Sequence, residues 1–205
     1  MILTAARISK LLDAGEKDSE DPLVIVPRPR LNLTEEAGAA SVDLRLGTWF
    51  LSLRQERLTH LAIDEHPPEA ELAKMHYVPF NRTYTLHPGC FVLGITLEWV
   101  RLSSDLTAYV VGRSTWGRRG LIIATATGVH PGFTGCLTLE LANVGEIPIM
   151  VKPGMAICQL FIQTVDAPQP AAIDRSRFVG LRRPVLGALG PDPVAEALAQ
   201  AHYAP

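Results

Sequence analysis

Apolar and polar residues alternate in short runs along most of the first 165 residues of the chain. In the stretch 41–53, for example, Val42 and Leu44 flank the polar Asp43, and a period of two is typical of a strand with one buried face. Clusters of turn-forming residues separate the runs, at positions 87–89, 103–105, 130–132, 143–146 and 152–154. The pattern predicts an all-β (mainly β) domain, built as a sandwich or a barrel.

The two ends of the chain depart from this alternation. Between Thr4 and Gly15 the apolar residues recur at helical spacing, which predicts one short helix that Thr4 caps and Gly15 ends. Residues 18–40 are rich in proline and polar residues and predict an extended arm and loop. We therefore expect a domain over residues 1–165, with the helix and arm at its start, and a tail over 166–205 that orders over a ligand or a neighbouring subunit.

Composition narrows the classes of function. Of the 205 residues, 47% are hydrophobic and 20% are charged, which is enough for one well-buried core. The formal net charge of -2 gives no basic field for a nucleic acid, so a small anionic ligand is expected instead. The start of the sequence has no signal-peptide pattern, and no apolar run approaches the roughly 20 residues that span a bilayer. We expect a cytoplasmic protein without a membrane partner.

The cysteines point to no metal site. Cys90, Cys136 and Cys158 lie far apart and are odd in number. This spacing gives neither a disulfide framework nor a zinc knuckle, so they are expected to be reduced core residues.

The segment GRSTWGRRG at residues 112–120 is the first candidate for chemistry. Ser114 could cap a short helical turn whose free amide groups point at an anion, and Arg113 or Arg118 would add charge-assisted hydrogen bonds. This interpretation makes the segment a phosphate cradle. The alternative is a tight turn with solvated arginines. Trp116 is expected to pack rather than to stack on a ligand.

The segment GCLTLELANVG at residues 135–145 holds the second candidate. Its alternation places the leucines on one face and Glu140 on the other. A strand glutamate is ordinarily a solvated surface residue. In a pocket of small residues beside bound phosphates, the carboxylate could instead be desolvated, gain a raised pKa and serve as acid and base.

Two residues of the loop GVHPGFTG leave their alternatives open. His130 is either a turn residue between two strands or a ligand contact, and nothing beside it has metal spacing. Phe133 is either a core aromatic or a plate against which a sugar or a base packs.

Five blocks of the sequence together resemble the deoxycytidine triphosphate deaminase family, which shares a superfamily with trimeric dUTPases. The blocks are ASVDLRLG, LHPGCFVLGITLEWVRLSSDL, GRSTWGRRGL, GVHPGFTGCLTLELANVG and KPGMAICQL, and they lie in order within residues 1–165. The resemblance implies a distorted β-barrel or jelly-roll of the dUTPase-like type and a homotrimer with active sites at subunit interfaces. It also implies a triphosphate bound with Mg2+ and deamination without zinc, and the sequence lacks the signature of the zinc deaminases.

The resemblance also implies roles for individual residues. Glu140 falls on the catalytic glutamate, Arg118 on the arginine that spans phosphate and catalytic water, and Ala126 near the backbone carbonyl that positions this water. Ser114 belongs to the phosphate-contacting motif and completes the catalytic set. The expected substrate-binding residues are Arg113, Ser114, Thr115, Arg118, Val129, His130, Phe133, Gln159, Phe178 and Arg182.

The chain differs from the family pattern at the sugar site and in the tail. Where the family usually has Ile-Asp-Pro-Gly, this chain has His130 in place of the aspartate. In the family that aspartate contacts the deoxyribose, and in dUTPases the corresponding residue activates water. In the tail, Phe178 and Leu181 replace a tyrosine and a glutamine, and Arg182 and Arg183 could supply charge.

Three functions are compatible with these residues. The first is deamination of a cytosine deoxynucleotide, dCTP to dUTP plus ammonia, by water that Glu140 activates. The second is a dUTPase-like pyrophosphohydrolase, for which His130 would have to replace a carboxylate base. The third is a non-catalytic trimeric nucleotide-binding protein that kept the barrel and lost the chemistry.

Overall fold

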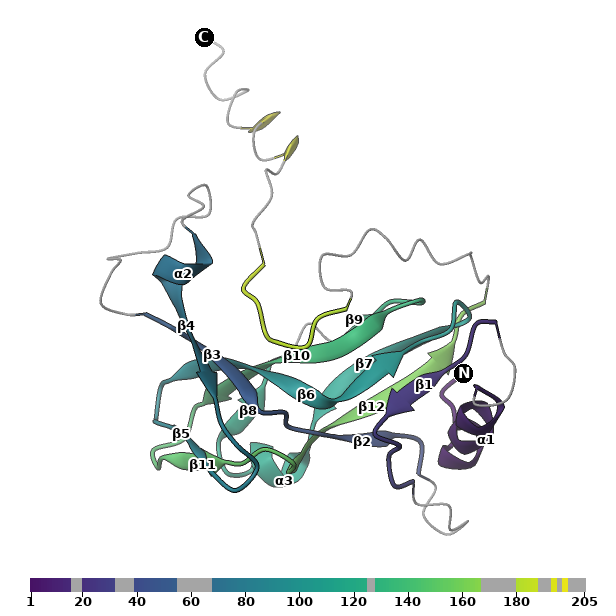
Figure 1. Cartoon of the computed structure of the whole chain (residues 1–205), viewed down its shortest axis with the longest axis horizontal. Coiled ribbons are helices and arrows are strands. Elements are labelled where there is room, and N and C mark those ends of the chain that lie inside the picture. Colours follow the sequence, from purple (N-terminus) through teal and green to yellow (C-terminus); the bar gives the residue numbers. More distant parts are fainter. Residues whose placement is uncertain are drawn as a thin grey trace.

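Two antiparallel sheets share one apolar core, and short helices lie at their edges (Figure 1). The computed structural model describes residues 1–15, 20–31, 39–54, 68–124, 128–166, 180–187, 193–194 and 197–198. The helices are α1 (Ala5–Gly15), α2 (Glu69–Leu72) and α3 (Ser114–Gly117). The strands are β1 (Val24–Val26), β2 (Val42–Arg45), β3 (Trp49–Leu53), β4 (Ala73–Tyr77), β5 (Tyr84–Leu86), β6 (Phe91–Arg101), β7 (Leu106–Gly112), β8 (Leu121–Ile123), β9 (Gly128–Val129), β10 (Thr134–Asn143), β11 (Ile149–Val151) and β12 (Ala156–Thr164).

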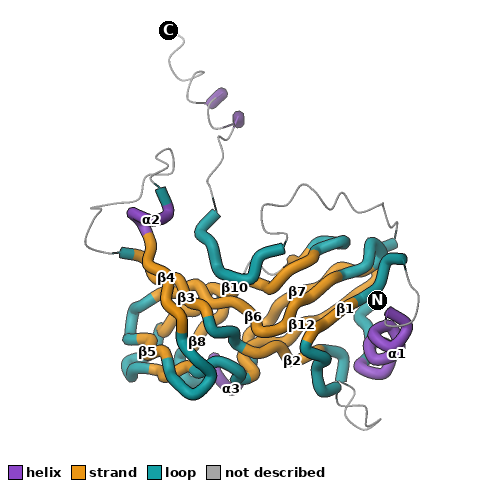
Figure 2. The backbone as a smooth tube through the Cα atoms, in the orientation of Figure 1, coloured by secondary structure: helices purple, strands orange, loops and turns teal. Residues whose placement is uncertain are grey.

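The larger sheet runs in the order β4-β3-β6-β10-β8, with β1 also paired to β6, and the second sheet runs β2-β12-β7-β9. A separate pair joins β11 to β5. Strands form the body of the molecule, as Figure 2 shows, while α1 lies at one end beside β1. The prediction of a mainly β fold with a short N-terminal helix is confirmed.

The N-terminal segment forms more structure than its prolines indicate. Thr4 caps α1 as predicted, because its Oγ1 accepts a hydrogen bond from the Arg7 backbone N–H at 3.3 Å. The prediction of only an arm and loop over residues 18–40 was wrong at β1, which pairs with β6. Ile25 is buried in the core, and this burial stabilises a strand too short to show as an alternating run.

The stretch 41–53, predicted as one strand run, forms two strands in different sheets. Its first half is β2, which pairs with β12, and its second half is β3, which pairs with β4 and β6. The chain changes sheets at Gly47, whose N–H donates to the Ile95 carbonyl at 2.7 Å. A Cβ on Gly47 would lie 3.0 Å from that oxygen, so any side chain here would force the backbone of β6 to move by a few tenths of an ångström.

A partly buried ion pair links the two sheets where β2 passes β6. Glu98 of β6 is fully buried, and its carboxylate accepts the Arg45 backbone N–H at 2.7 Å and an Arg45 guanidinium N–H at 3.2 Å. Burial raises the pKa of Glu98 above its ordinary range, and the hydrogen bonds and charge of Arg45 offset part of that rise.

The three cysteines are free thiols. Cys158 is buried in the core, whereas Cys90 and Cys136 are partly buried. Burial is the main cause that raises the pKa of Cys158 to about 12, so its thiol stays protonated at neutral pH. The predicted core position is confirmed for Cys158.

Glu98 is expected to make stability depend on pH in a defined direction. Because its pKa is raised in the folded state, the native protein holds a proton that the unfolded chain releases once the pH exceeds the ordinary value of 4.5. Stability that Glu98 contributes therefore falls as the pH rises through that window, by up to about 1.4 kcal/mol per pH unit. A Glu98→Gln variant keeps an oxygen for the Arg45 N–H and should lack this fall.

Urea unfolding of the wild type and of Glu98→Gln between pH 4.5 and 8 checks the expectation. The exposed Glu71→Gln on α2 serves as the control, since it removes the same charge without burial. A stability difference between wild type and Glu98→Gln that stays constant with pH would contradict it.

Candidate active site

Glu140 projects from the outer face of the larger sheet, as the alternation predicts. Along β10 the residues alternate between buried and partly buried, and Leu137, Leu139 and Leu141 point into the core. Glu140 lies opposite Leu93 of β6. Its side chain is partly buried, and among the residues that the structure describes its carboxylate has no hydrogen-bond or ion-pair partner. This arrangement leaves both oxygens available to water or a ligand.

The segment 112–120 forms a single helical turn at the end of β7. Arg113 is the N-cap residue of α3, with extended backbone angles and no side-chain capping bond. The prediction that Ser114 caps the turn was wrong, because the Arg113 carbonyl already accepts the N–H groups of Trp116 and Gly117 and the helix begins one residue earlier. Ser114, Thr115 and Arg118 are exposed to solvent.

Trp116 packs as predicted rather than standing free for a ligand. Its ring lies against the main core, and its Nε1–H donates to the Ala156 carbonyl at 2.9 Å. This contact anchors α3 to β12, and the exposed side chains of the turn project from the anchored helix.

Arg113 and Gln159 meet through a residue that the sequence analysis did not single out. Asp43 of β2 accepts an Arg113 guanidinium N–H at 2.7 Å and the Gln159 Nε2–H at 3.2 Å. Gln159 also donates to Ser41 Oγ at 3.2 Å. The sequence did offer a signal, since Asp43 is a polar residue in one of the five blocks, but only pairing of β2 with β12 places it beside the loop.

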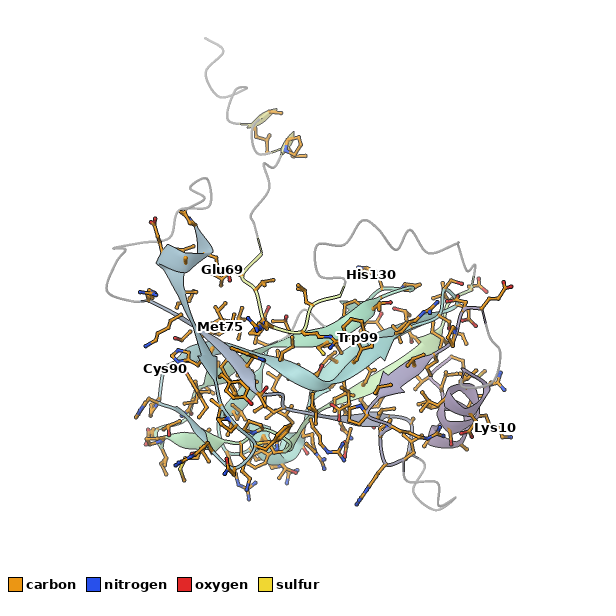
Figure 3. The ribbon with its side chains drawn as sticks, viewed as in Figure 1. Lys10, Glu69, Met75, Cys90, Trp99 and His130 are labelled. Atoms are coloured by element: carbon orange, nitrogen blue, oxygen red, sulfur yellow. The ribbon has the colours of Figure 1, made fainter. Side chains whose placement is uncertain are left out.

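The three candidate residues at the end of β9 and in the loop after it have different surroundings. Val129 is buried in the core, and its carbonyl accepts the Thr107 hydroxyl at 2.7 Å, so its side chain is not available to a ligand. Phe133 is partly buried against the core, which favours the core interpretation. His130, labelled in Figure 3, is exposed at the turn.

Residues 180–187 cross the outer face of the larger sheet, and we call them the strap. The Leu181 carbonyl accepts the Cys136 N–H at 2.9 Å, and the Gly180 N–H donates to the Thr134 carbonyl at 2.7 Å. The strap therefore starts along the edge of β10 and continues over β6 and β3 on the face that carries Glu140.

Two arginine–tryptophan contacts and an apolar contact hold the strap in place. Arg182 lies 5.0 Å from the ring centroid of Trp99, and Arg183 lies 4.1 Å from that of Trp49. Leu186 packs on the cluster that contains Leu51 and Leu93, and its N–H donates to Glu69 at 3.0 Å. Trp99 and Glu69, labelled in Figure 3, mark the two ends of this path.

The predicted site residues thus fall into two groups. Arg113 and Gln159 share Asp43 on the second sheet, next to the exposed turn of α3. Glu140 lies on the larger sheet opposite Leu93, which belongs to the cluster that Leu186 of the strap packs on. Within the described ranges, no hydrogen bond or ion pair joins Glu140 to the α3 turn. Arg182 packs on Trp99 rather than beside that turn. Ala126 and Phe178 lie outside the described residues.

In the part of the chain that the structure describes, no three histidine, cysteine, aspartate or glutamate side chains gather as a metal site. None of the helices in that part is long and apolar enough to cross a bilayer.

The fold is that of a known deaminase structure. The structure is similar to 2'-deoxycytidine 5'-triphosphate deaminase from Agrobacterium tumefaciens, with a TM-score of 0.55 and 24% identity over 78% of this chain and 46% of that chain. The match therefore spans less than half the length of that solved chain.

Sequence comparison identifies the family. The model of dCTP deaminase-like proteins matches residues 2–165, and the chain belongs to this family. It is 38% identical over 169 residues to a "dCTP deaminase, dUMP-forming" from Dictyoglomus thermophilum, covering 82% of each chain. It is 36% identical over 201 residues to a "dCTP deaminase" from Halorubrum lacusprofundi, covering 94% of this chain and 93% of the relative. The predicted family is confirmed.

The strap contacts generate a prediction. Arg183→Gln removes the cation above Trp49, a contact worth about 0.5–1 kcal/mol at an exposed site. The amide hydrogens of Cys136 and Gly180, which form the hydrogen bonds between β10 and the strap, should then exchange about three-fold faster. Hydrogen-exchange mass spectrometry measures this, and the exposed Arg82→Gln is the control. Unchanged exchange at both amides would show that the contact does not hold the strap.

Proposed function

We propose that the protein deaminates a cytosine deoxynucleotide, converting dCTP and water to dUTP and ammonia. Membership of the dCTP deaminase-like family supports this function. The single observation that carries it within the chain is the partly buried carboxylate of Glu140, which has no protein partner among the described residues. A carboxylate without structural bonds has both oxygens available to exchange protons with water and substrate.

The proposed reaction uses Glu140 twice. Glu140 first takes a proton from a water molecule, and the resulting hydroxide attacks C4 of the cytosine ring. Glu140 passes this proton to ring N3, then takes the proton of the new hydroxyl group and gives it to the amino group. The carbon–nitrogen bond breaks, ammonia leaves, and C4 keeps the oxygen as a carbonyl. Arg118 and Ser114 are proposed to contact the phosphates and the water, in line with the roles that the resemblance implies.

We further propose a homotrimer with active sites between subunits. Support comes from the position of the two groups of site residues on different sheets, since in the described part of the chain no hydrogen bond or ion pair joins the α3 turn to Glu140. A site at a subunit interface would bring the turn of one copy to Glu140 of another. The predicted Val129 contact fits such a site only through backbone atoms, because its side chain lies in the core.

Mg2+ enters the proposal as part of the nucleotide complex. The exposed hydroxyls and arginines of the α3 turn suit phosphate oxygens rather than a bare cation. Zinc-free chemistry and a cytoplasmic location remain predictions from the sequence.

A second candidate function is deamination coupled to pyrophosphate release, which would give dUMP. The name of the Dictyoglomus relative, "dCTP deaminase, dUMP-forming", favours this possibility. Against it, this chain has His130 where a carboxylate would activate the hydrolytic water, and an imidazole brings no negative charge.

Analysis of the products separates these functions. Purified protein is incubated with Mg2+ and, in turn, dCTP, CTP, dCMP and dUTP, and ammonia, pyrophosphate and nucleotides are measured. We expect dCTP to yield one ammonia per dUTP with all phosphates retained. Pyrophosphate together with dUMP from dCTP would support the second candidate, pyrophosphate from dUTP alone would support a dUTPase, and binding without conversion would support a non-catalytic protein.

Glu140→Gln tests the proposed base directly. The amide keeps the shape of the side chain but cannot accept the proton, so turnover of dCTP should fall by at least about 100-fold while the affinity for dCTP stays within a few-fold. Steady-state kinetics and calorimetry measure the two quantities. Glu146→Gln, in the exposed loop after β10, is the control. Near-normal turnover by Glu140→Gln would remove Glu140 from the mechanism.

A further inference from the structure

The contacts around Asp43 assign it a task that neither the motifs nor the relatives' names indicate. We infer that Asp43 is a positioning residue, which holds the Arg113 guanidinium in place for the triphosphate before the nucleotide arrives. The inference rests on the proposed function, because it takes the ligand of the α3 turn to be a nucleotide triphosphate.

Three neighbouring strands supply the parts of this arrangement. In the second sheet β12 lies between β2 and β7, and Gln159 of β12 stands opposite Asp43 on one side and Val111 on the other. Arg113 follows β7 by one residue, and its backbone N–H donates to the Ile157 carbonyl of β12 at 3.3 Å. Regular pairing therefore fixes where Asp43 lies relative to Arg113.

The two oxygens of Asp43 have different partners. Oδ2 accepts the Arg113 guanidinium at 2.7 Å, while Oδ1 accepts Gln159 Nε2 at 3.2 Å. Gln159 is itself held by Ser41 Oγ at 3.2 Å. Gln159 thus orients the Asp43 carboxylate. The charge-assisted bond from Arg113 to this carboxylate selects one rotamer of the long Arg113 side chain.

Fixing this rotamer favours ligand binding. A free arginine side chain loses rotamer entropy when a ligand orders it. Asp43 removes part of that loss in the unbound protein. A guanidinium has five N–H groups, so the engagement of Arg113 NH1 by Asp43 leaves other donors for phosphate oxygens.

The negative charge of Asp43 acts in the opposite direction, but this effect is smaller. The Asp43 and Arg113 side chains are 42% and 33% exposed, so solvent screens the repulsion between the carboxylate and a phosphate. Arg118 and Arg119, both exposed on the same short turn, add positive charge. We therefore expect the net effect of Asp43 on triphosphate binding to be favourable.

The test compares Asp43→Asn with a closely matched aspartate elsewhere. Asp21 also pairs with an arginine, Arg101, at side-chain exposures of 42% and 35%, and it also accepts a second bond, from the Ser104 N–H. Both Asp→Asn changes remove one negative charge from an ion pair of similar burial. We expect Asp43→Asn to raise the KM for dCTP and its Kd by about tenfold with kcat within about two-fold, and Asp21→Asn to change neither.

A double-mutant cycle distinguishes positioning from a general structural role. If Asp43 acts through Arg113, Asp43→Asn should have no further effect on Kd once Arg113 is replaced by alanine. Asp43→Glu, which keeps the charge, should recover part of the affinity. Equal tenfold losses in the wild-type and Arg113→Ala backgrounds, or a lower Kd for Asp43→Asn than for wild type, would overturn the inference.

The readouts separate this inference from the proposed function. Calorimetric titration with Mg2+ and dCTP needs no turnover, so it measures the effect of Asp43 even if the wild type releases no ammonia. Ammonia release by the wild type with an unchanged Kd and KM in Asp43→Asn would refute the positioning role alone. Failure of the wild type to bind dCTP would refute both.

Discussion

The contact between Glu98 and Arg45 is the constraint on which the arrangement of the two sheets depends. A buried carboxylate is costly unless it is paired, and here both bonds to Glu98 come from one residue of the other sheet. The bond to the Arg45 backbone N–H fixes the main chain of β2, not only a side chain. Because Asp43 lies on the same strand two residues away, the position of β2 also sets the position of Arg113.

The site is built on the outer surfaces of two sheets rather than in the core. The core side chains of β10 and β12 hold the strands, while the residues between them face outward and carry the chemistry. On one sheet this leaves the carboxylate of Glu140 without a protein partner among the described residues, and on the other it gives Arg113 a fixed partner. Both features follow from strand alternation, because successive side chains of a strand point to opposite faces and so alternate between packing in the core and facing outward.

The sequence predicted those features that depend on local pattern. The mainly β fold, α1 with its Thr4 cap, the outward face of Glu140 and the packing of Trp116 each follow from spacing within a few residues. It could not predict contacts between distant strands. Strand pairing determines the role of Asp43, the burial of Val129, the formation of β1 and the contact of Arg182 with Trp99. The cap of α3 was predicted one residue too late, at Ser114 instead of Arg113.

The passage at Gly47 leads into a strand, β3, that has two apolar faces. Phe50 of β3 is buried in the main core, whereas Leu51 belongs to the apolar cluster beneath the strap. A shift of β3 by one residue against β4 and β6 would exchange these two faces and turn every side chain of β3 over. The close passage of the connection over β6 therefore helps to keep the core face and the strap face of β3 apart, although no residue in it touches a ligand in the proposed mechanism.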